Sequence, residues 1–169
     1  MFFSPDDWSS IIFRLVLAVL VGSTIGLNRQ RSGRPAGLRT FMIVSLGAAL
    51  FVMIPLQAES DLGYASSNAL SRTIQGVASG VGFLGAGIIL QQSHQNLNKV
   101  EVKGLTSAAS IWLAAALGAA AGCGLWRMVL VGLILTLITL SGVKQLKKKK
   151  LSTLVYRSEN SKIVDKELK

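Results

Sequence analysis

The chain has 169 residues and a formal net charge of +10; half of its residues are hydrophobic, 15% are charged, and its mean hydropathy is +0.50. This apolar content exceeds what one soluble core of this length normally needs. The charges also fall between long uncharged runs rather than within them, which argues against a compact soluble domain.

Five apolar runs of about membrane-spanning length follow one another along the chain. Each is close to the roughly 20 residues that a helix needs to cross a hydrocarbon core, and none alternates apolar and polar residues as a barrel strand does. A soluble helical bundle is disfavoured because the runs lack polar faces. We therefore expect an all-α polytopic membrane protein, with a bundle of five transmembrane helices in residues 1–143 and a basic cytoplasmic tail in residues 144–169. The runs are 11–27, 36–56, 74–90, 106–125 and 128–143.

Lysine and arginine residues are distributed unequally between the two sides of the predicted membrane. Arg14, Arg72 and Arg127 fall on one side, and the rest of the 18 basic residues fall on the other. The positive-inside rule then places the N-terminus outside and the C-terminus in the cytoplasm, which requires an odd number of spans. We expect Arg14, near the start of the first run, to snorkel to the interface.

Residues 76–87 read GVASGVGFLGAG and contain the pattern GxGxxG. A dinucleotide-binding loop needs this pattern at a strand-to-helix turn, whereas these glycines lie inside an apolar run. On a helix they form two stripes of small residues, which let neighbouring helices approach closely, so we expect helix three at the centre of the bundle. Local unwinding that exposes carbonyl groups to an ion is the alternative. The expected helix-packing residues are Gly76, Gly80, Gly82, Gly85, Gly87, Gly118 and Gly122.

The polar residues in or beside the runs are mostly arginines and hydroxyls. Such residues cap helices, snorkel or hydrogen-bond between helices. Those at the cytoplasmic ends of helices two and four are also candidates for binding an anionic headgroup or a partner. Both interpretations stay open for the candidate residues Arg39, Thr40, Arg72, Gln75, Thr106, Ser107 and Ser110. The single cysteine, Cys123, excludes an internal disulfide, and we expect it to be a small packing residue.

Acidic residues are absent from all five runs. Mg²⁺ usually keeps one or two carboxylate partners, so no carboxylate is available for a cation pathway inside the membrane. The sequence also shows no catalytic triad, no metal-ligand cluster and no GxxxxGK[ST] loop. We therefore expect no enzyme activity, no bound metal and no cofactor. The acidic residues are Asp6, Asp7, Glu59, Asp61, Glu101, Glu159, Asp165 and Glu167.

The high positive charge raises the question of nucleic acid. Half of the basic residues lie in the tail, immediately beyond a predicted membrane helix. Such a juxtamembrane patch attracts anionic lipid, so we expect Lys147, Lys148, Lys149 and Lys150 to face the lipid surface and expect no nucleic-acid binding.

Three stretches together resemble the signature blocks of the MgtC/SapB family of bacterial inner-membrane proteins. They are RPAGLRTFMIVSLGAALF (34–51), SRTIQGVASGVGFLGAGIIL (71–90) and VKGLTSAASIWLAAALGAAAG (102–122). The resemblance implies a five-helix domain in the bacterial inner membrane and a link to survival at low magnesium and under acid stress. Asn28 and Gln30 stand where relatives commonly carry acids beside an arginine, and Ala69 and Leu70 stand where they tend to show Asp-Pro. Many relatives also carry a soluble C-terminal domain, which this sequence does not show.

Two functional interpretations follow. In the first, the chain is a non-catalytic membrane protein that contributes to magnesium or ion homeostasis by binding another membrane protein or a second copy of itself. In the second, it is a transporter or transporter subunit, for which the resemblance implies Mg²⁺ as the substrate. The absence of acidic residues from the apolar runs favours the first interpretation.

Overall fold

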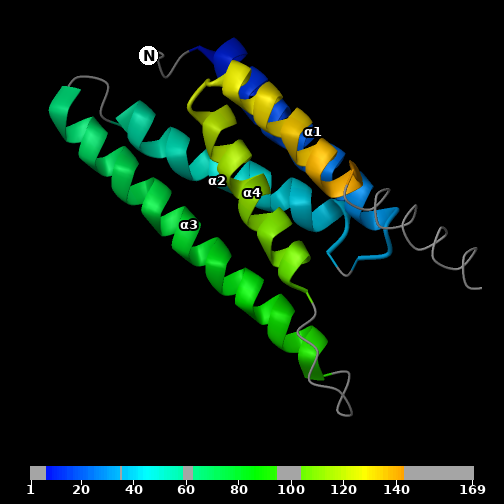
Figure 1. Cartoon of the computed structure of the whole chain (residues 1–169). Coiled ribbons are helices and arrows are strands. Elements are labelled where there is room, and N and C mark those ends of the chain that lie inside the picture. The colour runs from blue at the N-terminus through cyan, green and yellow to red at the C-terminus, as the bar shows by residue number, and fades with distance from the viewer. Residues whose placement is uncertain (1–6, 35, 59–62, 95–103, 143–169) are drawn as a thin grey trace, which may run out of the picture. The chain divides into compact units, whose positions relative to one another are not determined.

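The computed structural model describes residues 7–34, 36–58, 63–94 and 104–142, and every regular element in these ranges is a helix. The helices are α1 (Trp8–Gln30), α2 (Leu38–Ala58), α3 (Gly63–His94) and α4 (Leu105–Gly122), followed by a shorter apolar helix, Trp126–Gly142 (Figure 1). The predicted all-α polytopic fold is confirmed. Which side of the membrane holds the N-terminus stays a prediction.

Four of the helices are long and apolar enough to cross a membrane. They correspond to the first four apolar runs, and the fifth run forms the helix Trp126–Gly142. By their contacts the residues divide into two units, Met1–Leu133 and Ile134–Lys169. The predicted boundary after residue 143 and the basic patch at Lys147–Lys150 lie outside the described residues.

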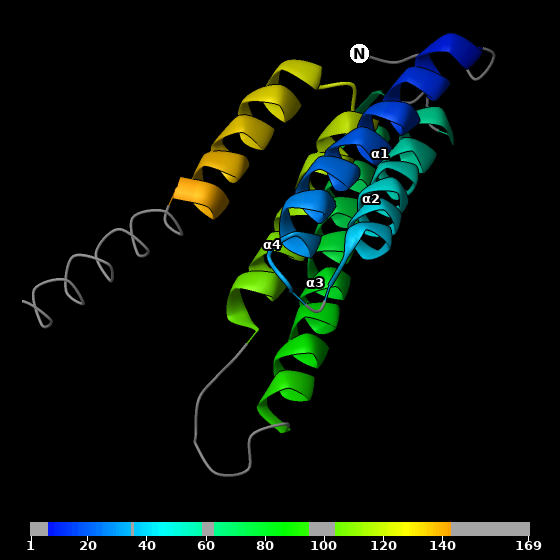
Figure 2. The same ribbon diagram turned by 90° about the vertical axis from the view of Figure 1, so that its right-hand side faces the viewer.

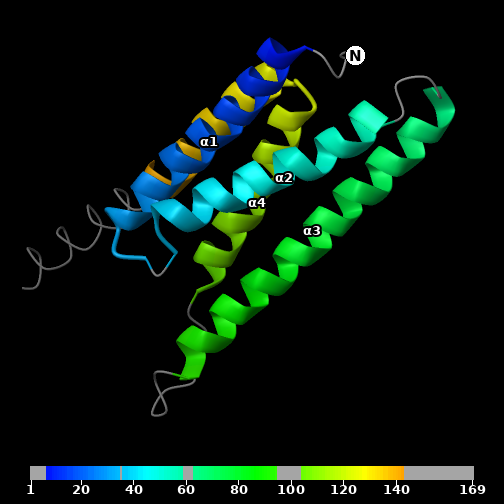
Figure 3. The same cartoon turned by 180° about the vertical axis from the view of Figure 1, so that it is seen from behind.

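Within the first unit, α2 and α4 are the central helices, and α4 is the more buried of the two. Each contacts the other three long helices, whereas α1 and α3 do not contact each other (Figures 2 and 3). Of the most apolar stretch of α4, 61% of residues are buried, against 11% for α3. The expectation that helix three lies at the centre is therefore wrong. Stripes of small residues permit close packing on either side of a helix, but they do not determine which helix gains neighbours there.

Glycines allow α1, α2 and α4 to approach closely. A Cβ atom added at Gly22 of α1 would lie 2.5 Å from the Phe41 carbonyl oxygen of α2, and one at Gly26 would lie 2.8 Å from the Leu38 Cα. Neither neighbouring atom can rotate away, because both belong to the backbone. Gly22 and Gly26 form a GxxxG pattern, which was the available sequence signal for this contact.

Two local features set the ends of the helices. The Asp7 side chain caps α1 by accepting a hydrogen bond from the Ser10 amide at 3.2 Å. Bonds from the Ser9 hydroxyl and the Ser10 amide hold the pKa of Asp7 below its ordinary value of 3.8. At the far end of α4, Gly124 adopts a φ of +76°, a conformation that favours glycine, so α4 ends at Gly122 rather than continuing to the end of the apolar run.

Candidate functional site: the open face of α3 and the ends of α4

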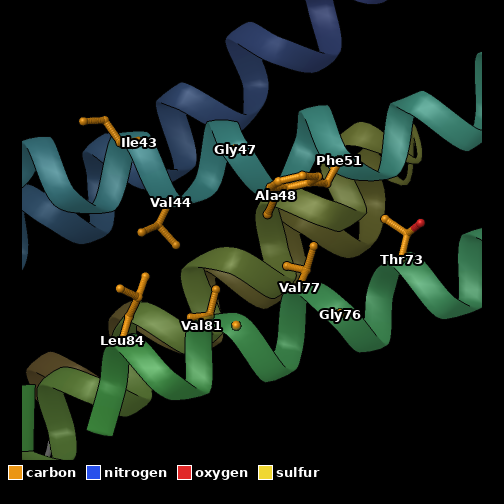
Figure 4. Close-up of a pocket in the computed structure, with 11 residues that line it drawn as sticks. Ile43, Val44, Gly47, Ala48, Phe51, Thr73, Gly76, Val77, Val81 and Leu84 are labelled. Carbon is orange, nitrogen blue, oxygen red and sulfur yellow. The ribbon is translucent and has the colours of Figure 1, made fainter. Parts of the chain in front are cut away.

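An apolar groove runs between α2 and α3 (Figure 4). It has a volume of about 630 Å³, and Thr73 is the one residue in its lining with a polar side chain. Ile43, Val44, Gly47, Ala48 and Phe51 of α2 form one wall, and Thr73, Gly76, Val77, Gly80, Val81 and Leu84 of α3 form the other. Two of the predicted packing glycines, Gly76 and Gly80, therefore line an open groove.

The glycines of α3 are mostly free of neighbouring helices. A Cβ atom added at Gly76, Gly80, Gly82 or Gly87 would meet nothing within 4 Å, whereas one at Gly85 would lie 3.1 Å from the Ala108 Cβ of α4. Glycine offers no side chain for contact with lipid and leaves the backbone accessible. Gly76, Gly80 and Gly87 share one face of α3, which we call the open face, and this face is thus shaped for close approach by a further helix.

The two predicted glycines of α4 lie at close contacts inside the unit. A Cβ atom at Gly118 would collide with the Ser45 backbone of α2, and one at Gly122 would lie 2.6 Å from the Ala49 carbonyl oxygen. Ser45 itself is fully buried and donates a hydrogen bond to the Ala18 carbonyl of α1 at 2.8 Å. This region joins α1, α2 and α4.

The predicted polar residues do not gather into one cluster. The side chains of Arg39, Thr40, Arg72, Gln75 and Thr106 are exposed. Ser107 and Ser110 of α4 are buried, and the Ser110 hydroxyl donates to the Thr106 carbonyl of its own helix. The hydrogen bond that the structure gives to the Ser107 hydroxyl comes from Arg29 and not from Arg39.

Arg14 does not snorkel as expected. Only 6% of its surface is exposed, and its Nη1 donates to the Gly122 carbonyl oxygen of α4 at 2.8 Å. Its guanidinium also lies beside Gly124, where an added Cβ would be 3.0 Å from Nη2. The small glycine leaves room for the arginine to reach the C-terminal end of α4, and half-buried Cys123 lies in the same turn.

Arg29 lies between the first two apolar runs, in a segment that we expect to be cytoplasmic. It is a functional candidate that the sequence alone did not indicate. It lies in the last turn of α1 and is 4% exposed. Its Nη2 donates to the Ser107 Oγ of α4 at 3.2 Å, and its Nε has no hydrogen-bond partner among the described residues. An arginine at the end of an apolar run is usually interpreted as an interfacial residue, so no pattern in the sequence marked its burial.

The helices themselves supply no carboxylate to these two arginines, and only Arg14 has an acidic residue, the cap Asp7, close enough to interact with it among the described residues. None of the five helices carries an aspartate or a glutamate. The described residues also hold no group of three or more His, Cys, Asp or Glu residues that could bind a metal ion.

The sequence model of the MgtC family matches residues 15–149. The chain belongs to the MgtC family. It is 59% identical over 150 residues to protein SrpB of Synechococcus elongatus, covering 88% of this chain and 82% of SrpB. It is 38% identical over 140 residues to the putative magnesium transporter YhiD of Escherichia coli K12, and 35% identical over 126 residues to protein MgtC of Salmonella typhimurium.

Several MgtC-family relatives are longer than this chain. The match to YhiD covers 82% of this chain and 62% of YhiD, and the match to MgtC covers 75% of this chain and 49% of MgtC. No solved structure matches the chain. Family membership thus supports a bacterial membrane protein linked to magnesium homeostasis.

Proposed function

We propose that this chain is a non-catalytic, multi-pass protein of the bacterial inner membrane that contributes to magnesium or ion homeostasis by binding another membrane protein through the open face of α3. The single observation that carries the proposal is the exposure of this face. α3 has the length and composition of a membrane span, yet a Cβ atom added at any of the three glycines of this face would meet nothing within 4 Å.

Close approach of a helix is what such a surface favours. Helices in lipid associate through van der Waals packing, and small residues at the contact allow the backbones to come near. The adjoining groove is apolar along both walls and lies between α2 and α3 (Figure 4). A transmembrane helix of a partner could therefore pack on the glycines while its larger side chains enter the groove.

Ion transport by this chain alone has less support. Charged residues inside a membrane protein usually mark an ion pathway, but the helices here carry no carboxylate that could replace part of the hydration shell of Mg²⁺. The naming of the relative YhiD as a putative magnesium transporter agrees with a role in magnesium homeostasis. In our proposal that role belongs to the complex with the partner.

The test uses a photo-crosslinking residue in place of Gly80, with Leu20 as the matched control. Both positions are exposed on membrane-spanning helices, but Leu20 lies on α1, away from the groove. We expect the Gly80 position to yield a specific product with another membrane protein in cells grown at low magnesium. A product of two copies of this chain would instead assign the face to self-association, and equal yields at both positions would contradict the proposal.

A substitution supplies the functional half of the test. Gly80→Leu places a large side chain at the groove, and nothing lies within 4 Å of its Cβ. We expect normal amounts of folded protein but loss of growth at low magnesium in a host that depends on this chain. Full complementation by the variant would refute the role of the open face.

A further inference from the structure

α4 meets a buried arginine at each of its ends, and the two ends differ in polarity. Arg14 donates to the carbonyl oxygen of Gly122, at the C-terminal end, where the helix dipole is negative and a cation is stabilised. Arg29 donates to the hydroxyl of Ser107, in the first turn. There the unpaired N–H groups make the helix end positive. Arg29 therefore places a full positive charge against the positive end of a buried helix.

No negative charge offsets Arg29 in the part of the chain that the structure describes. Its guanidinium is buried, and Nε lacks a hydrogen-bond acceptor among the described residues. α4 begins after Gly104, with no side-chain cap and no acidic residue in its first turn. An uncompensated buried charge is strongly destabilising, so an anion bound beside Arg29 would stabilise the folded chain.

Further cations lie at the same end of the unit. The loop that follows α1 folds back so that the Arg34 amide donates to the Arg29 carbonyl at 3.3 Å, and the Arg31 and Arg34 side chains are exposed. The α1–α2 loop and the beginning of α4 lie together at this end (Figure 2). Exposed cations around a buried one attract an anion toward it.

We propose that Arg29 and the first turn of α4 form a binding site for a phosphate group. The phosphate oxygens would accept hydrogen bonds from Arg29 Nε and from the free N–H groups at the start of α4, the arrangement that binds anions at other helix N-termini. The phosphate is either that of an anionic lipid headgroup or a free inorganic phosphate. This site is separate from the open face of α3, so it does not depend on the partner proposed above.

The test uses the full chain reconstituted in nanodiscs of neutral phosphatidylcholine. Thermal unfolding is measured while inorganic phosphate replaces chloride at constant ionic strength. A second arm replaces part of the neutral lipid with phosphatidylglycerol. Arg29→Gln removes the proposed ligand, and Arg39→Gln is the matched control because Arg39 is an exposed arginine at the start of α2.

We expect an anion to raise the unfolding midpoint of the wild-type chain and of Arg39→Gln, and to leave that of Arg29→Gln unchanged. A rise with inorganic phosphate identifies a free anion, and a rise with phosphatidylglycerol alone identifies a lipid headgroup. Loss of one charge-assisted hydrogen bond should weaken anion binding by about tenfold or more. Arg29→Lys, which keeps the charge, should retain part of the effect.

Four results would overturn the proposal. The first is an unchanged wild-type midpoint in both arms, and the second is an equal rise in Arg29→Gln. The third concerns stability without an anion. Without an anion, Arg29→Gln should be at least as stable as the wild type, because the substitution removes an uncompensated charge. If the variant instead unfolds at a lower temperature or fails to fold, the role of Arg29 is purely structural. The fourth result concerns Glu101, which precedes α4 in the sequence. If Glu101→Gln destabilises the wild type but not Arg29→Gln, the group that binds Arg29 is the chain's own carboxylate and not a phosphate.

Discussion

Replacing Gly118 by alanine tests the close contact between α4 and α2. The added Cβ would collide with the backbone of Ser45, and a backbone neighbour can move only if the whole helix shifts. The same change at Gly80 meets nothing within 4 Å. Any gain in helix propensity is common to both variants, so the difference between their free energies of unfolding measures the cost of the collision. We expect a difference of about 3 kcal/mol, at the upper end of typical overpacking costs.

The assay is reversible unfolding of both variants in mixed micelles, followed by far-ultraviolet circular dichroism. Gly80→Ala should unfold at or slightly above the wild-type midpoint, and Gly118→Ala should unfold well below it. Equal stability of the two variants would refute the reasoning, because it would mean that α4 and α2 are not in contact at Gly118.

Four further predictions concern single positions. Ser45→Ala should lower the free energy of unfolding by about 0.6 to 1.7 kcal/mol, since it removes one interhelical hydrogen bond; no loss would contradict the bond to Ala18. Gly124→Ala should destabilise by at least about 1–2 kcal/mol, the cost of a left-handed conformation for a residue with a Cβ, and should also displace Arg14; an unchanged midpoint would argue against that turn. Reporters fused after Arg31 should be active in the cytoplasm, and an external location would refute the predicted sidedness. Because the pKa of Asp7 is lowered in the folded chain, its cap should hold near neutral pH and fail as the pH falls through that pKa, which amide exchange in the first turn of α1 would detect as faster exchange.

The positions of the helices could be predicted from the sequence. Uncharged apolar stretches of membrane-spanning length are a strong signal, and the first, second and fourth runs coincide with α1, α2 and α4 within three residues. The third run, 74–90, lies inside α3, which begins eleven residues earlier, at Gly63. α4 ends three residues before the fourth apolar run does, because the turn that ends the helix depends on the backbone conformation of Gly124. Hydropathy does not register such a conformation.

The neighbours of each helix could not be predicted in the same way. In a soluble bundle the polar face marks the outside, but a membrane helix is apolar on all sides, so lipid-facing and buried positions look alike. The sequence predicts both Gly80 and Gly118 as packing glycines, yet of these two only Gly118 is in close contact with a neighbouring helix in the described chain. Arg14 and Arg29 are buried because both side chains bind α4, and the sequence does not show that α4 lies beside them.

The central claim is that this chain contributes to ion homeostasis without carrying ions itself. The most direct measurement is Mg²⁺ flux into proteoliposomes that contain only the purified chain, compared with protein-free liposomes from the same lipid. Our account predicts equal uptake in both preparations. Saturable uptake that requires the protein would contradict it and would establish the chain as a transporter.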